Sequence, residues 1–99
     1  MGYKISEKAA EDIENIWLYT FENWSLEQAD RYLDLIFDEI EYLAANPTAG
    51  KDFSHVRKHY RRSKVKSHIV FYRHVENQSE IEVIRVLHQR MEIEARLDD

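Results

Sequence analysis

SHIVFYRHVENQSEIEVIRVLHQRM, the stretch from Ser67 to Met91, decides the fold. Apolar side chains alternate through residues 69–75 and again through residues 81–87, and a polar link, residues 76–79, separates the two runs. A period of two is typical of half-buried strands, and a short polar link between two such runs is typical of a hairpin. The stretch therefore predicts two antiparallel strands.

The second of these strands carries apolar side chains on both faces near its end. Strict alternation places Ile84 and Val86 on one face, and Val83 and Leu87 on the other. Each apolar face needs a cover. Helices can cover one face, whereas the other needs the chain's own end, a second copy, or a partner that lays a helix or strand onto it.

Two helices are predicted upstream of the hairpin. Ser6 is placed to cap the first, Ser25-Leu26-Glu27-Gln28 has capping-box spacing for the second, and Asn46-Pro47 ends the second. Apolar residues recur at three- and four-residue steps in both, which predicts inward stripes that include Trp17 and Ile36. Two helices joined by a tight corner form an antiparallel hairpin.

The remaining segments are shorter. Residues 3–6 predict a first strand, 48–54 a loop, 59–64 a basic strand, and 92–97 a short helix or tail. The expected order is β-α-α-β-β-β with a short C-terminal helix or tail. This is an α+β fold, with the helical hairpin packed on a small, largely antiparallel sheet. A chain of 99 residues with 43% hydrophobic content can bury one core, so residues 1–99 are expected to form one domain.

Composition narrows the location and the chemistry. The chain has no cysteine, which excludes a disulfide scaffold and fits a reducing compartment. No apolar run approaches the roughly 18 residues of a membrane helix, and the N-terminus lacks the apolar stretch of a signal peptide. We therefore expect a cytoplasmic protein that does not enter a membrane. His55 and His59 have a chelating spacing but lie among Arg and Lys, so no metal or cofactor is expected.

Charge is divided unevenly along the chain. Residues 1–50 hold 3 Lys/Arg against 11 Asp/Glu, a balance of −8, and residues 75–99 hold 3 against 7, or −4. Residues 51–74 hold 8 against 1, a balance of +7. This basic segment predicts a surface for an anionic partner, either nucleic acid or an acidic protein segment. The alternative is a sheet edge that Lys and Arg protect against pairing with other edges.

The chain resembles ParE toxins, the gyrase-poisoning branch of the RelE/ParE toxin superfamily, over about Tyr3 to Glu92. The resemblance is carried by an ordered set of residues rather than by one strong motif. Its closing part is His68-Ile69-Val70-Phe71-Tyr72-Arg73 followed by Arg85-Val86-Leu87-His88-Gln89-Arg90-Met91-Glu92. Its upstream part comprises Ala9, Asp12, Ile13, Ile16, Trp17, Tyr19, Thr20, Trp24, Gln28, Ala29, Tyr32, Leu43, Asn46, Pro47 and Gly50.

The resemblance implies the toxin of a type II toxin–antitoxin or plasmid-stabilization system. Such a protein would bind DNA gyrase without being an enzyme, and a ParD-like antitoxin would wrap it with its C-terminal segment. Direct contact with nucleic acid stays open. The residues expected to bind a partner are Arg61, Arg62, Lys64, Phe71, Arg73, Val83, Arg85, Leu87 and His88.

Two other functions remain open at this stage. RelE-type relatives are ribosome-dependent endoribonucleases, and here Arg62, Arg73, Arg85 and His88 would grip the phosphate and move the proton. The sequence departs from that pattern, because no tyrosine follows Tyr72 and residues 51–74 contain a single acid. An inactive member that only binds its antitoxin is the other possibility. In a purely structural role, Arg73 and Arg85 would pair with helix acids such as Glu39 or Glu41.

Overall fold

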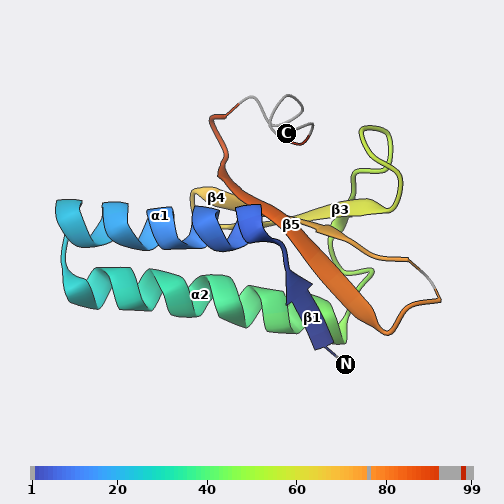
Figure 1. Ribbon diagram of the computed structural model, residues 1–99, viewed down its shortest axis with the longest axis horizontal. Helices are drawn as coiled ribbons and strands as arrows, with labels where there is room; N and C mark the ends of the chain where they lie inside the picture. The colour runs from blue at the N-terminus through green and yellow to red at the C-terminus, as the bar shows by residue number, and fades with distance from the viewer. Residues whose placement is uncertain (1, 76, 92–96, 98–99) are drawn as a thin grey trace.

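The computed structural model describes residues 2–75, 77–91 and 97. Its helices and strands, labelled in Figure 1, are β1 Gly2–Ile5, α1 Glu7–Asn23, α2 Leu26–Ala45, β2 Lys51–Asp52, β3 Tyr60–Val65, β4 His68–Arg73 and β5 Glu80–His88. The predicted α+β fold and element order are confirmed. The short strand β2 lies inside the segment predicted to be a loop. The predicted terminal helix or tail lies outside the described residues, apart from Leu97.

The strands form one mixed sheet in the order β1-β5-β4-β3-β2. β2, β3, β4 and β5 pair antiparallel, as expected, whereas β1 runs parallel to β5 and pairs only with its first half, from Glu80 to Val83. The helices run side by side and antiparallel (Figure 1). We call the sheet face toward the helices the inner face and the opposite face the outer face.

Side-chain caps fix where both helices begin. The Ser6 hydroxyl accepts a hydrogen bond from the Ala9 N–H at 3.0 Å, and the Ser25 hydroxyl accepts one from the Gln28 N–H at 3.1 Å. These caps satisfy N–H groups that have no partner within the helix. Ser25 starts α2 immediately after α1 has ended at Trp24, so the corner between the helices is tight. The predicted hairpin is confirmed.

The inner face holds the main core. Ile36, Ile40 and Leu43 of α2 are fully buried against this face. Trp17 was predicted to share this core but is only half-buried: its indole N–H donates to Asp30 at 3.0 Å, and its ring stacks on Phe21. Because the polar indole edge needs a partner, Trp17 lies at the seam between the two helices.

A bulge in β5 overturns the predicted assignment of faces. Phe71 pairs with Arg85, but the next residue, Tyr72, pairs with Val83, so β5 holds one extra residue, Ile84. A bulge shifts the alternation by one residue. Strict alternation had placed Val83 on the same face as Leu87, and this prediction is wrong. Val83 packs in the main core on the inner face, whereas Leu87 packs on the outer face.

A buried tyrosine ties the loop after α2 to the sheet. The Tyr72 hydroxyl donates to the Pro47 carbonyl at 2.8 Å and accepts from the Gly50 N–H at 2.9 Å. A Cβ at Gly50 would lie 2.3 Å from the Tyr72 oxygen, so only glycine fits this close approach. Burial raises the pKa of the Tyr72 hydroxyl, which keeps it neutral as a donor.

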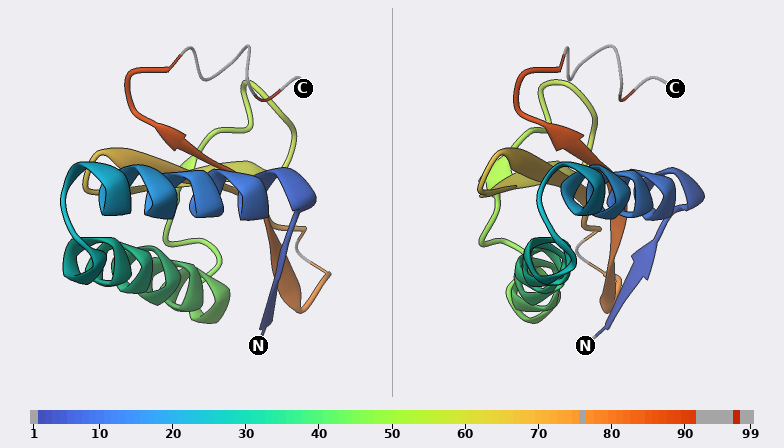
Figure 2. Two further views of the ribbon diagram at one scale, coloured as in Figure 1. Left: turned by 60° about the vertical axis from the view of Figure 1, so that its left-hand side comes forward. Right: turned by 90° about the vertical axis from the view of Figure 1, so that its left-hand side faces the viewer.

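The outer face carries a second, smaller apolar cluster, which we call the outer cluster. The loop between β2 and β3 rises on this side, away from α2 (Figure 2). Val56 and Tyr60 from the loop and the start of β3 pack against the cluster. The outer cluster consists of Phe53, Ile69, Phe71, Leu87 and Leu97.

Candidate partner-binding surface

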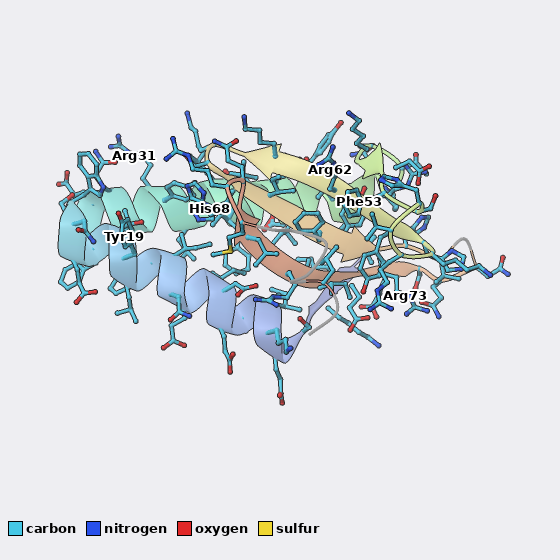
Figure 3. The ribbon with its side chains drawn as sticks, turned by 90° about the horizontal axis from the view of Figure 1, so that it is seen from above. Tyr19, Arg31, Phe53, Arg62, His68 and Arg73 are labelled. Atoms are coloured by element: carbon cyan, nitrogen blue, oxygen red, sulfur yellow. The ribbon has the colours of Figure 1, made fainter. Side chains whose placement is uncertain are left out.

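Three basic side chains surround the outer cluster. In β3, Arg62 pairs with Phe71 and Lys64 with Ile69, and in β4 Arg73 pairs with Tyr60, so the alternation of both strands puts all three cations on the outer face. Figure 3 looks down on this side and labels Arg62, Phe53 and Arg73. We call Arg62, Lys64 and Arg73 the basic rim. An apolar floor inside a cationic rim suits a partner that is both apolar and acidic.

Within residues 2–75, 77–91 and 97, the contacts of Arg62 and Arg73 are weak. The Arg62 guanidinium lies 5.1 Å from the centre of the Phe53 ring, a cation–π contact. Arg73 approaches Glu82 at 4.0 Å, and the two side chains are 43% and 41% exposed. An exposed pair at this distance contributes little to stability. Both cations can therefore be redirected to a ligand at small cost.

Arg61, by contrast, holds the protein together. It pairs with Tyr72 in the sheet, and its guanidinium donates to the Gly50 carbonyl at 2.8 Å and more weakly to the Thr48 carbonyl at 3.4 Å. These bonds fix the same loop that Tyr72 holds. Of the predicted partner-binding residues, Arg61 and the buried Val83 thus lie in structural positions, and Phe71 and Leu87 form the buried floor of the outer cluster.

Arg85 is engaged in an ion pair that is largely shielded from solvent. Its guanidinium donates to both carboxylate oxygens of Asp12, at 2.8 and 3.0 Å, and the two side chains are 13% and 14% exposed. The acids suggested from the sequence do not fill this role: Asp12 pairs with Arg85, while Glu39 accepts a hydrogen bond from Ser63. A bidentate ion pair of this kind fixes the orientation of the two side chains relative to each other.

His88 lies on the inner face, in a groove between α1 and the end of β5. The groove has a volume of about 470 Å³, and Ile16, Tyr19 and Met91 supply much of its apolar lining. Tyr19 and Met91 are 65% and 43% exposed. None of these three residues was predicted to bind a partner. Ile16 follows Asp12 by four residues, and Tyr19 follows Ile16 by three, so all three share one face of α1. Helical periodicity could therefore have indicated Ile16 and Tyr19 as neighbours of Asp12 on this surface.

The two histidines of the groove form hydrogen bonds through their Nδ1 atoms. His68 Nδ1 lies 2.6 Å from the Tyr32 hydroxyl, which also accepts the Ser67 N–H, and His88 Nδ1 accepts the Arg90 N–H at 3.1 Å. A neutral imidazole has one acceptor nitrogen, so His88 presents no free lone pair to a ligand. Burial, followed by the neighbouring His88, lowers the pKa of His68 to about 4.

The four residues of the nuclease alternative do not meet at one point. Arg62 and Arg73 lie on the outer face, Arg85 is held by Asp12 at the edge, and His88 pairs with His68 on the inner face. A phosphate at Arg62 would have the sheet between it and His88. The residues thus form two separate surfaces: the outer cluster with its basic rim, and the groove beside α1.

Two negative findings concern the described residues alone. Within residues 2–75, 77–91 and 97, no three side chains of the kinds that ligate metals come together, and His55 and His59 do not form such a site. Neither helix in this described part combines the length and apolar character that crossing a membrane requires.

Comparison with solved structures and curated proteins identifies the class. A chain of the structure described as "Chromosomal ParDE TA system from P. aeruginosa" shares the fold, with a TM-score of 0.74, 22% identity, and coverage of 89% of this chain and 95% of that one. Two helices on a five-stranded mixed sheet, with an apolar outer face inside a basic rim, therefore define a small α+β protein with the fold found in a toxin–antitoxin system.

The family follows from the sequence matches. The family described as "ParE toxin of type II toxin-antitoxin system, parDE" matches residues 3–93. Toxin ParE1 of Mycobacterium tuberculosis and Toxin ParE1 of Caulobacter vibrioides are each 39% identical over 95 residues, 96% of both chains. Toxin ParE of Escherichia coli is 30% identical over 98 residues, 99% of this chain and 94% of that protein. The chain belongs to the ParE toxin family.

Proposed function

We propose that this toxin poisons DNA gyrase by binding to it, without catalysing a reaction of its own, and that a ParD-like antitoxin neutralises it. Family membership supports the toxin role and the pairing with an antitoxin. The observation that carries the proposal is the outer face, where a buried apolar floor lies inside a basic rim; among the described residues, Arg62 and Arg73 of this rim make only weak contacts.

The arrangement of the candidate catalytic groups favours binding over catalysis. A general base needs an available lone pair close to the proton that it removes. The lone pair of His88 is occupied by the Arg90 N–H, and His88 faces away from Arg62 and Arg73. A protein that acts by surface complementarity needs neither a base nor a cofactor. We propose on the same grounds that the toxin works in the cytoplasm, where gyrase and DNA are found.

The antitoxin segment that this surface would receive is acidic and apolar. Apolar side chains would extend the outer cluster, and carboxylates would neutralise the basic rim. The groove beside α1, with Tyr19 and Met91 exposed, offers a second apolar contact to the same partner. We expect the antitoxin to cover both surfaces, as a segment that wraps its target does.

Two parallel assays test the proposal. Purified toxin is added to gyrase with relaxed plasmid, and separately to a translation reaction with messenger RNA. We expect supercoiling to stop and the messenger RNA to stay intact. Addition of the antitoxin encoded beside the toxin should restore supercoiling. Cleaved messenger RNA together with unaffected gyrase would refute the proposal.

A further inference from the structure

The outer cluster is closed by a residue from the end of the chain. Leu97 is 5% exposed and packs with Phe53, Ile69, Phe71 and Leu87. The main core, which the helices cover, lies on the other face. Leu97 therefore buries apolar surface that would otherwise face solvent.

The position of Leu97 is open on one side. A groove of about 400 Å³ adjoins it. Its lining is mixed: Ile84 and Leu97 are apolar, Ser6 is polar, Lys8 and Arg85 are basic, and Glu7 and Glu82 are acidic. The bulge that inserts Ile84 into β5 places this side chain beside the cluster. An incoming aliphatic side chain can thus approach along the groove while Leu97 is still in place.

The sequence around Leu97 has the chemistry that complements the basic rim. Residues 92–99 contain four acids, Glu92, Glu94, Asp98 and Asp99, and one cation, Arg96, a balance of −3. The outer face presents Arg62, Lys64 and Arg73 around its apolar floor. The chain therefore carries an acidic segment with an aliphatic side chain, and that side chain lies on a basic, apolar surface.

We infer that Leu97 is an intramolecular plug, and that the outer face is a docking site for an acidic partner segment that inserts one Leu-sized side chain in its place. The inference rests on the proposed function, since the antitoxin is the expected partner. A tethered end has a high effective concentration, so the site is open only part of the time. The apparent affinity of a competing ligand equals its intrinsic affinity multiplied by the fraction of time that the site is open. The chain's own end thus sets how tightly the antitoxin must bind.

A peptide with the chain's own terminal sequence, residues 91–99, is the appropriate probe. Labelled MEIEARLDD is titrated by fluorescence anisotropy against the full-length chain and against Leu97→Asp. We expect the variant to bind at least about tenfold more tightly than the unmodified chain, because an aspartate at this position cannot remain in an apolar site. Added salt should weaken the binding.

Matched controls isolate the site. Leu26→Asp makes the same chemical change at a residue that is 53% exposed on the helical hairpin, and it should leave peptide binding at the unmodified level. Arg62→Glu combined with Leu97→Asp should abolish the gain. A peptide in which the leucine is replaced by aspartate should not bind. Leu97→Ser serves the same purpose if thermal melting shows that Leu97→Asp is unfolded.

Several results would overturn the inference. Equal peptide affinity for the unmodified chain and a folded Leu97 variant would show that Leu97 closes nothing. Absence of binding to the opened variant would show that the site does not accept acidic, aliphatic segments. Dimerisation of that variant without peptide binding would assign the face to a second copy. If the Leu97 variant binds the peptide more tightly but the unmodified chain leaves gyrase active, the proposed function is refuted and the plug is not.

Discussion

Asp12 closes the edge of β5 by binding Val86. Its carboxylate accepts the Val86 backbone N–H at 3.0 Å and, with both oxygens, the Arg85 guanidinium. β1 pairs with β5 only as far as Val83, so α1 takes the position of a neighbouring strand beyond that point. A side chain thus does what a strand backbone would do, and the sheet edge is protected.

Replacement of Asp12 by Ala should destabilise the protein strongly. It removes both hydrogen bonds that the Arg85 guanidinium donates to Asp12, and the acceptor of the Val86 N–H. Loss of one partner of a buried pair typically costs about 3–5 kcal/mol. Urea denaturation measures the change. Asp12→Asn keeps an acceptor and should cost less, and equal stabilities for Asp12→Ala and the unmodified chain would refute this role of the carboxylate.

Ile36 should matter more for stability than Trp17. Ile36 is fully buried under the inner face, so Ile36→Ala should lower the free energy of unfolding by about 2–5 kcal/mol. Trp17 is only half-buried, and Trp17→Ala should cost less. Thermal melts of the two variants compare them directly. A larger loss for Trp17→Ala would mean that the helix seam, and not the sheet, holds the main core.

Gly50 and Tyr72 should behave as a coupled pair. Gly50→Ala brings a methyl group against the buried Tyr72 ring and should destabilise the loop, while Tyr72→Phe leaves the Gly50 N–H and the Pro47 carbonyl unpaired, at a cost of about 1–3 kcal/mol. A double-mutant cycle by urea denaturation measures the coupling. Gly50→Ala should cost less when Tyr72 is already Phe, and strict additivity would contradict the contact.

Stability should fall as the solution is acidified through the range set by His68. The pKa of His68 is lowered from an ordinary 6.5 to about 4, so between these values the unfolded chain binds the proton that the folded chain rejects. Stability contributed by neutral His68 is complete above about pH 6.5 and is lost as the pH falls toward 4. After allowance for solvent screening, the loss amounts to about 1–2 kcal/mol.

Urea midpoints measured across this pH range test the point. His68→Gln should flatten the slope between pH 6.5 and 4, whereas His55→Gln, a change at an exposed residue, should leave it unchanged. Identical slopes in all three proteins would show that His68 is not responsible.

Local signals accounted for most of the fold. Ser6, Ser25 and Asn46-Pro47 marked the helix ends correctly, because capping depends on residues that are neighbours in sequence. The assignment of Val83 to the face of Leu87 failed, because a bulge depends on how two strands pair and leaves no mark in simple alternation. Composition likewise gave no sign that Trp17 would satisfy its indole N–H at Asp30.

The candidate site was only partly predictable. The charge of residues 51–74 indicated a basic surface, and the strand predicted over residues 59–64 contains Arg62 and Lys64. That these two side chains share the outer face follows only from the pairing of β3 with β4. The partners of Arg61 and Arg85 depend on contacts between distant segments, so the sequence could not show that both are used internally. The packing of Leu97 on the outer cluster also depends on contacts between residues distant in sequence, so the sequence could not show it.

We propose that this toxin acts through a binding surface and not through acid–base chemistry. Arg62 and His88 separate the two mechanisms, because they lie on opposite faces of the sheet. Arg62→Glu changes the basic rim without touching the groove, and His88→Ala does the reverse. Both variants must keep the unmodified melting temperature before their activities are compared.

The most direct measurement is the amount of cleaved plasmid DNA that remains covalently attached to gyrase when the reaction is stopped with detergent. The unmodified toxin and His88→Ala should both make cleaved DNA accumulate, and Arg62→Glu should reduce it by about tenfold or more. Poisoning of gyrase by surface binding is refuted if no cleaved DNA accumulates. It is also refuted if the folded His88→Ala variant is about 10²- to 10⁴-fold less active, as the loss of a general acid would require.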